Sequence, residues 1–190
     1  MKKYIIISLF AFFAATLTSS SVGYPKHQFG LGYSMISGAG LEYQIEFNMH
    51  SAFKFHAIAY YSGEKPPYIL QIVGIAGAEY QYNLSKNKDI RNYLFLGASA
   101  WHFEDRDQRQ YYVNDMLFED NTIKLNRIWN FGAGYGLQYM LFSNVAVNFD
   151  IGIYYQISDE SEGTNPFFDR DPEGTSFFGI GGGIGFRFSL

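Results

Sequence analysis

Residues 179–190 alternate between two kinds of side chain almost without interruption. The apolar face carries Ile180, Ile184, Phe186, Phe188 and Leu190, and the opposite face carries Gly179, Gly181, Gly183, Gly185, Arg187 and Ser189. A period of two indicates a β-strand whose two faces meet different surroundings. Lipid on one side and a crowded polar interior on the other are the surroundings of a strand in a membrane-spanning β-barrel.

The same alternation recurs along the chain and predicts about eight strands. The segments that carry it are residues 29–35, 41–50, 53–61, 70–84, 93–103, 129–141, 145–157 and 179–190. Short turns follow the second, fourth and sixth segments, and a tight turn at residues 37–40 follows the first. Longer connections follow the others, at residues 63–67, 104–121 and 158–176. This pattern predicts an all-β fold, an eight-stranded antiparallel up-and-down transmembrane β-barrel.

The fifth of these segments, residues 93–103, leaves the direction of its two faces open, because both faces are apolar. One candidate lipid-facing set is Tyr93, Phe95, Trp101 and Phe103, and the other is Leu94, Leu96, Ala98 and Ala100. We favour the first set, because aromatic residues stand at both of its ends and such residues gather at membrane interfaces.

The N-terminus has the order of a secretory signal. Lys2 and Lys3 precede a short apolar run at residues 4–15, and small residues follow at positions 16–21. We therefore expect a signal peptide over residues 1–21, with cleavage as late as residue 23, and a barrel domain over residues 22–190. The chain has no cysteine, which excludes disulfides and a lipoprotein anchor at this site. Without Lys2 and Lys3, 12 basic residues face 18 acidic ones, a balance that argues against binding nucleic acid.

A secreted lipocalin-like barrel would show the same period with its faces exchanged, apolar inside and polar outside. Two features favour the membrane barrel instead. Glycines gather on the polar face of the first, sixth and eighth segments, where a narrow interior needs small residues. Aromatic residues gather near the segment ends, as they do in the interfacial girdles of membrane barrels.

The last segment resembles the C-terminal strand of the small eight-stranded outer-membrane proteins of the OmpX/OmpA-barrel type, a porin-like group. In that family a glycine and alternating aromatic or apolar residues form a signal for the barrel-assembly machinery. Gly185, Phe186, Phe188 and Leu190 match it, with leucine in place of the usual terminal phenylalanine. The resemblance implies export across the inner membrane of a Gram-negative bacterium and insertion into the outer membrane, with lipid and lipopolysaccharide as surroundings.

Seven ionisable residues fall on the predicted inner face: Glu42, Glu46, Lys54, His56, Glu79, Asp150 and Arg187. The interior of an eight-stranded barrel is narrow enough for side chains to fill. Buried charges must pair or stay hydrated, so we interpret the seven as an ion-paired plug, with Lys54 and Arg187 close to Glu46 and Glu79. A narrow polar pathway is the alternative.

No residue pattern predicts a catalytic, cofactor or metal site. The acidic, aromatic loops could hold Ca²⁺, but they lack the ordered spacing of a calcium loop. Barrels that modify lipid A are the enzyme alternative, and here the nearest Ser/His pair is Ser99 and His102, which point to opposite faces of a strand. We therefore expect a monomeric, non-enzymatic barrel without a cofactor that serves envelope structure or adhesion through its extracellular loops, with an extracellular protein or glycan as its possible ligand. The alternatives are a narrow channel for small solutes and, third, a lipid A-modifying enzyme.

Overall fold

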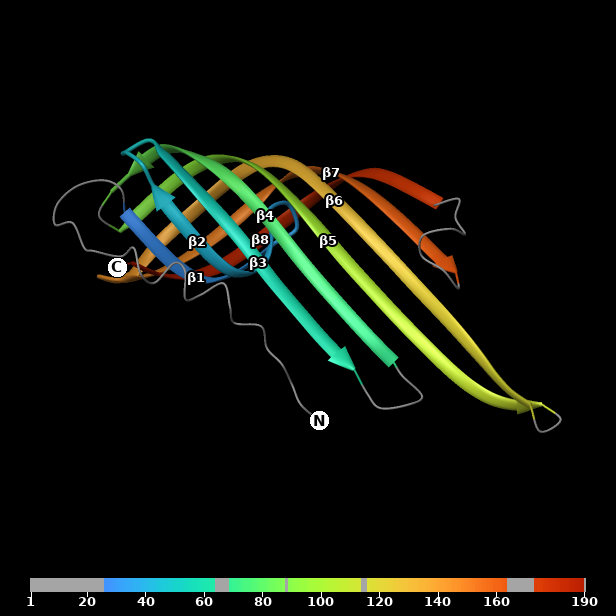
Figure 1. Ribbon diagram of the computed structural model, residues 1–190. Coiled ribbons are helices and arrows are strands. Elements are labelled where there is room, and N and C mark those ends of the chain that lie inside the picture. The colour runs from blue at the N-terminus through green and yellow to red at the C-terminus, as the bar shows by residue number, and fades with distance from the viewer. Residues whose placement is uncertain (1–25, 64–68, 88, 114–115, 164–172, 190) are drawn as a thin grey trace.

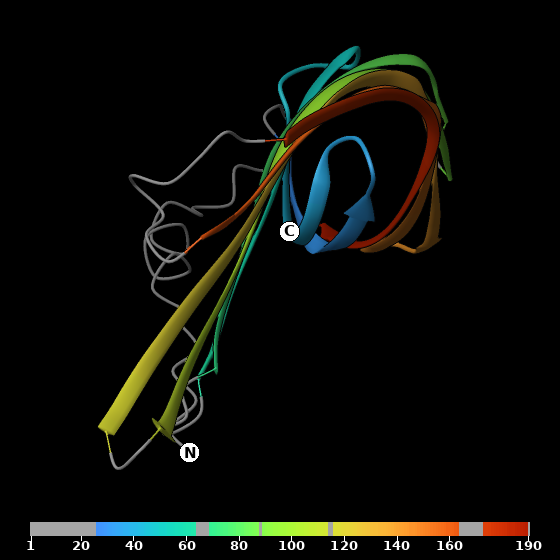
Figure 2. The same cartoon turned by 90° about the vertical axis from the view of Figure 1, so that its right-hand side faces the viewer.

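The structure is a computed structural model that describes residues 26–63, 69–87, 89–113, 116–163 and 173–189. The predicted signal peptide and Leu190 lie outside these ranges. The described residues form eight strands: β1 Lys26–Ser34, β2 Gly38–Glu46, β3 Ser51–Gly63, β4 Ile69–Lys86, β5 Ile90–Val113, β6 Met116–Phe142, β7 Val145–Gly163 and β8 Glu173–Ser189. Each strand pairs antiparallel with its neighbour in the chain, and β8 pairs with β1 (Figures 1 and 2). The predicted all-β, eight-stranded up-and-down barrel is confirmed. None of the described residues belongs to a helix long and apolar enough to cross a membrane.

The register of the strands fixes the width of the barrel. A walk from Gly30 across successive paired residues, through β2 to β7, arrives on β8 at Phe177. Gly30 itself pairs with Arg187, so the walk around the barrel is displaced by ten residues along β8. Such a stagger tilts the strands and leaves an interior that side chains fill.

Large apolar side chains are exposed around the outside of the barrel. They include Leu31, Leu41, Phe55, Tyr80, Leu94, Leu96, Phe131, Tyr135, Phe149, Ile151, Ile153, Phe186 and Phe188. Most of the residues that alternate with them in the chain are small or polar and face inward, with Phe95 as an apolar exception. Gly185 of the predicted assembly signal lies on this inner face, close to Asn148 and Glu42, whereas Phe186 and Phe188 lie outside. A polar interior inside an apolar outer surface is the reverse of a soluble barrel.

The favoured facing of the fifth segment is wrong. Tyr93 and Phe95 are buried inside the barrel, and Leu94 and Leu96 are exposed on its outer face. The neighbouring strand explains why, because Tyr93 pairs with Gly136 and Phe95 pairs with Gly134. These glycines leave room on the inner face that only large side chains fill. The aromatic residues are therefore interior packing and do not form an interfacial girdle.

Two of the predicted long loops are largely strand. β5 and β6 stay paired from Ile90–Tyr139 to Val113–Met116, and β7 pairs with β8 as far as Glu160–Glu173. The loss of apolar alternation after Phe103 ends the apolar surface but does not end backbone pairing. Beyond it, Arg106 Nε donates to Glu104 Oε1 at 2.5 Å. Partial burial raises the pKa of Glu104, but the hydrogen bond and positive charge of Arg106 outweigh it, so this pKa is lower than usual.

The first hairpin is much shorter than the others. β1 and β2 contain nine residues each, and their turn at residues 35–37 bends into the barrel instead of continuing its wall. Figure 2 shows the turn end of this hairpin curling into the ring that the strands form. Met35, which the period places on the outer face, packs instead against buried residues inside the barrel. We call residues 35–37 the infolded turn.

Candidate functional site: the barrel interior

The structure places all seven predicted interior residues inside the barrel, and each of them is buried. They form three groups, which centre on Lys54, on Arg187 and on Glu46. Lys54 forms an ion pair with Glu79, as predicted, whereas neither Lys54 nor Arg187 forms an ion pair with Glu46 among the contacts of the described residues. The reason is that Glu46 lies near the end of the barrel where β1 begins and β8 ends, and Lys86 reaches it there.

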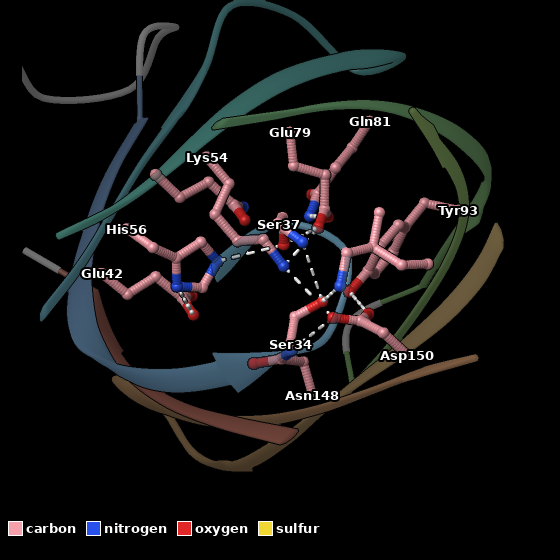
Figure 3. A network of polar contacts seen from close by, with 12 residues as sticks. Ser34, Ser37, Glu42, Lys54, His56, Glu79, Gln81, Tyr93, Asn148 and Asp150 are labelled. Carbon is pink, nitrogen blue, oxygen red and sulfur yellow. Dashed lines mark hydrogen bonds and ion pairs between the residues drawn. The ribbon is translucent and has the colours of Figure 1, made fainter. Parts of the chain in front are cut away.

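The first group is an ammonium ion between two carboxylates (Figure 3). Lys54 Nζ lies 2.9 Å from Glu79 Oε1 and 3.2 Å from Asp150 Oδ2, and its side chain is completely buried. Tyr93 donates from its hydroxyl to the other oxygen of Asp150 at 2.5 Å, and Gln81 donates to Glu79 at 2.5 Å. These residues come from β3, β4, β5 and β7, so a single cluster joins half of the barrel wall.

The second group surrounds Arg187 on β8. Its guanidinium forms an ion pair with Glu42 and donates to Gln44 Oε1 at 2.6 Å and to Gln138 Oε1 at 3.1 Å. Glu42 Oε2 in turn lies 3.8 Å from Nδ1 of the His56 ring. The group therefore bridges β8, β2, β3 and β6 across the interior.

Arg91 is an interior cation that the sequence analysis missed. It donates to Asn83 at 2.5 Å, to Gln81 at 2.6 Å and to Gln138 at 3.0 Å, and it lies 4.0 Å from Glu46 Oε1. Its guanidinium also lies over the Tyr93 ring, 4.7 Å from the centroid. The signal was available, because Arg91 shares a face with Tyr93 and Phe95. It was missed because Arg91 falls in the short turn predicted between residues 84 and 93, and because the wrong facing of the segment that follows gave no inner face to extend back to it.

The infolded turn closes the interior above these ion pairs. Ile36 is buried and packs with Tyr93, Phe95 and Tyr154. Glycines on three strands make the space for it, because side chains at Gly97, Gly132 and Gly152 would each meet Ile36. Gly38 has a φ of 97° and Gly40 a φ of 119°, values that favour glycine and allow the sharp bend. The turn is therefore seated on the barrel wall and fills its centre.

Polar contacts join the turn to the ion pairs below it. Ser37 donates from its hydroxyl to Glu79 Oε2 at 2.7 Å, and the same hydroxyl lies 3.4 Å from His56 Nε2 (Figure 3). Ser34 accepts the backbone N–H groups of Ile36 and Ser37 at 3.2 Å each. The turn is thus held by apolar packing on one side and by hydrogen bonds on the other.

Ser37, His56 and Glu42 stand in the order of a serine, histidine and acid triad, but their geometry is not that of a hydrolase. The hydroxyl of Ser37 donates to Glu79, and Ser37 is fully buried. A nucleophile must reach both its base and a substrate carbonyl. The pair considered from the sequence, Ser99 and His102, is also separated: Ser99 is buried inside, while His102 lies 3.4 Å from Glu104. Among the described residues no cluster of His, Asp and Glu could hold a metal ion.

Comparisons with known proteins concern the fold. No family model matches the chain. No curated protein matches it. Among solved structures, Acinetobacter baumannii CarO2 has a TM-score of 0.41 and 9% identity, over 87% of this chain and 98% of that chain. Acinetobacter baumannii CarO has a TM-score of 0.38 and 12% identity, over 90% of this chain and 100% of that chain. The functional proposal therefore rests on the residues of this chain.

Proposed function

We propose that this chain is an outer-membrane β-barrel protein, exported by a signal peptide over residues 1–21 and composed of a barrel domain over residues 22–190. The exposed apolar surface supports this location, since the outer face carries Leu96, Ile151 and Ile153 while charged side chains are enclosed. Lipid is the surrounding that favours this arrangement. The three short turns share the end of the barrel with the start of β1 and the end of β8, which is then the periplasmic end.

The barrel does not conduct solutes in this proposal. The main support for a non-conducting barrel is that its interior is closed at two levels, first by the Lys54 and Arg187 groups and then by the infolded turn. Lys54, Gln44, Gln81 and Ser37 have no exposed surface. A pathway for small solutes would need these paired side chains to separate, which leaves charges without partners at high cost.

The function then belongs to the part of the protein outside the membrane. β5 and β6 continue as a paired hairpin for ten residues on each strand beyond Phe103, where the apolar surface ends, as the long arm in Figures 1 and 2 shows. We propose that this non-enzymatic, monomeric protein serves envelope structure or adhesion through this extension, with lipopolysaccharide, a protein or a glycan as the surface that it meets.

Planar-bilayer recordings test the closed interior. Purified, heat-modifiable protein is expected to give no discrete openings, whereas stable single-channel steps would contradict the proposal and support the narrow channel. A variant with Ile36→Gly and Ser37→Gly serves as the comparison, because it keeps the ion-pairing residues and the hairpin and removes the side chains that form the upper closure, including the Ser37 hydrogen bond to Glu79. Mass spectrometry of lipid A from cells with and without the protein addresses the enzyme alternative, and an altered acylation profile would support that alternative.

Shortening of the arm tests the extracellular role. Arg106 pairs with Ile123, so residues 107–122 can be replaced by an Asn-Gly turn that suits a two-residue hairpin. This variant is expected to keep its heat-modifiable migration and to lose attachment of expressing cells to host-cell or glycan-coated surfaces. Unchanged attachment, compared with cells without the protein, would show that the arm is not the adhesive element.

A further inference from the structure

The wall of the barrel is incomplete on one side, above the infolded turn. β2 pairs with β3 only as far as Ala57, so within the described part of the chain residues 58–63 of β3 pair with β4 alone. β1 pairs with β8 as far as Gly183, and one further hydrogen bond joins Met35 N to Gly182 O. Residues 173–181 of β8 therefore pair with β7 alone, among the described residues. β3 and β8 face each other here as two unpaired edges.

The inner face changes character at the same level. Below the turn, the inner residues of β3 are Lys54 and His56, which are 0% and 3% exposed. Above it, the same face of β3 carries Ile58 and Tyr60, which are 45% and 55% exposed although they face the interior. Along β3 the inner face is thus enclosed and polar below the turn, and exposed and apolar above it.

Contacts between rings establish that aromatic residues line this upper inner face. Trp101 donates from its indole N–H to the buried Ser99 hydroxyl at 3.0 Å, which fixes it on the inner side of β5. The rings of Trp101 and Tyr33 form a T-shaped pair with their centroids 6.2 Å apart, although β1 and β5 are on opposite sides of the barrel. The ring of Phe177 on β8 forms a T-shaped pair with the ring of the buried Tyr154, with their centroids 6.0 Å apart.

No charge interrupts this surface. Between the infolded turn and the paired row of Phe103, Asn126, Glu160 and Glu173, the described inner-face positions carry no charged side chain, and the first charges above the turn are the carboxylates of that row. At the β8 edge the outward residues Phe178 and Ile180 are 81% and 77% exposed, so the inner apolar surface continues directly into the outer one. A polar solute would gain little here, whereas a hydrocarbon chain would bury apolar area on both of its sides.

We propose that the acyl chain of an outer-leaflet lipid enters sideways between the β3 and β8 edges and lies on the inner face formed by Ile58, Tyr60, Trp101 and Phe177, with the infolded turn as its floor. The inference rests on the proposed membrane location. The occupant is a hydrocarbon chain because the outer surface that borders the gap is the one that contacts lipid.

The two tryptophans of the chain provide the test. Trp129 is exposed on the outer face of β6 and pairs with Ala100, the residue next to Trp101, so the two indoles lie at nearly the same level on opposite faces. The variant W129F leaves only Trp101 as the fluorophore, and W101F leaves only Trp129. Each variant is reconstituted in phosphatidylcholine vesicles, with bromine either on the acyl chain near the headgroup or absent.

A third variant measures how far lipid bromine outside the barrel quenches an indole that is enclosed inside it, and this value is the baseline. Phe95→Trp, combined with W101F and W129F, places an indole on the inner face below the turn, where Phe95 is enclosed. Brominated lipid is expected to quench Trp101 well above this baseline and by a comparable fraction to Trp129. Adding Ile58→Asp to W129F should return the quenching of Trp101 toward the baseline, while the same change in W101F should leave Trp129 unaffected.

The outcomes separate the two proposals. If Trp129 is not quenched by brominated lipid, the membrane location itself fails. If Trp129 is quenched but Trp101 stays at the baseline and is quenched by aqueous acrylamide instead, water fills the upper interior and the acyl-chain site is overturned. If Phe95→Trp does not give heat-modifiable protein, the response of Trp101 to Ile58→Asp decides, and no response overturns the site.

Discussion

Replacement of Lys54 by methionine removes the cation that holds two buried carboxylates together. Glu79 and Asp150 each lie within 3.2 Å of Lys54 Nζ, so the two bound oxygens are no more than about 6 Å apart. Without the ammonium, their repulsion alone is roughly 3 kcal/mol at an effective dielectric constant of about 20. Loss of one partner from a buried ion pair typically costs about 3–5 kcal/mol in total. We therefore expect Lys54→Met to lower the free energy of unfolding by that amount, a change of two to three orders of magnitude or more in the folding equilibrium.

Urea unfolding in detergent micelles, followed by tryptophan fluorescence and by heat-modifiable migration, measures this change. The matched control is Lys86→Met, because Lys86 also pairs with a carboxylate, that of Glu46, but is partly exposed. Its expected cost is about 1 kcal/mol or less, as for exposed pairs, and Arg91 remains 4.0 Å from Glu46.

A triple variant distinguishes charge from packing. Lys54→Met together with Glu79→Gln and Asp150→Asn has no uncompensated carboxylate and should recover a large part of the lost stability. If Lys54→Met unfolds within about 1 kcal/mol of the unmodified protein, the interior is hydrated enough to stabilise two free carboxylates. The closed interior that underlies the proposed function would then be refuted.

Three further substitutions address the turn and the outer face. Ile36→Ala empties the space between Tyr93 and Tyr154 and should cost about 2–5 kcal/mol by urea unfolding, and a cost near zero would show that the turn is not seated. Gly77→Ala places a methyl group against the Ser37 carbonyl oxygen and should cost about 1–3 kcal/mol, with Gly74→Ala, which meets nothing, as the unaffected control. Leu96→Arg should cost about 2–4 kcal/mol for folding into vesicles, and an effect below about 1 kcal/mol would place this face of β5 away from lipid.

The predictable part of the fold is the part in which one face is apolar and the other is polar. β7 is the clearest case, since Phe149 and Ile151 are exposed outside while Asn148 and Asp150 are buried inside. The same rule failed on β5, because the interior there is apolar as well. What decides its facing is the opposite strand, whose glycines at positions 134 and 136 accept Phe95 and Tyr93. Sequence alternation within one strand carries no information about the size of residues on its neighbour.

The infolded turn was beyond the reach of local sequence rules for a similar reason. Ser37, Gly38 and Gly40 are the residues of an ordinary tight hairpin, and nothing in them distinguishes a turn in solvent from one inside a barrel. The information lies in Gly97, Gly132 and Gly152, far along the chain, which the register brings around Ile36. Glycines of the first, sixth and eighth segments were predicted to suit a narrow lumen, and of these Gly132 on β6 makes room for Ile36 together with Gly97 on β5 and Gly152 on β7.

The closure of the barrel and the gap in its wall have one cause. Residues 35–37 fill the interior because β1 and β2 leave the wall early, and the wall beside them is missing for the same reason. A longer first hairpin would supply the missing pairs for β3 and β8, but it would withdraw Ile36 from its seat on the glycines of β5, β6 and β7. Larger side chains on β5, β6 and β7 cannot fill this space in the native structure, because a side chain at Gly97, Gly132 or Gly152 would collide with Ile36. The short hairpin therefore couples a sealed polar half to an apolar half that opens toward lipid, and a change in its length should alter both properties together.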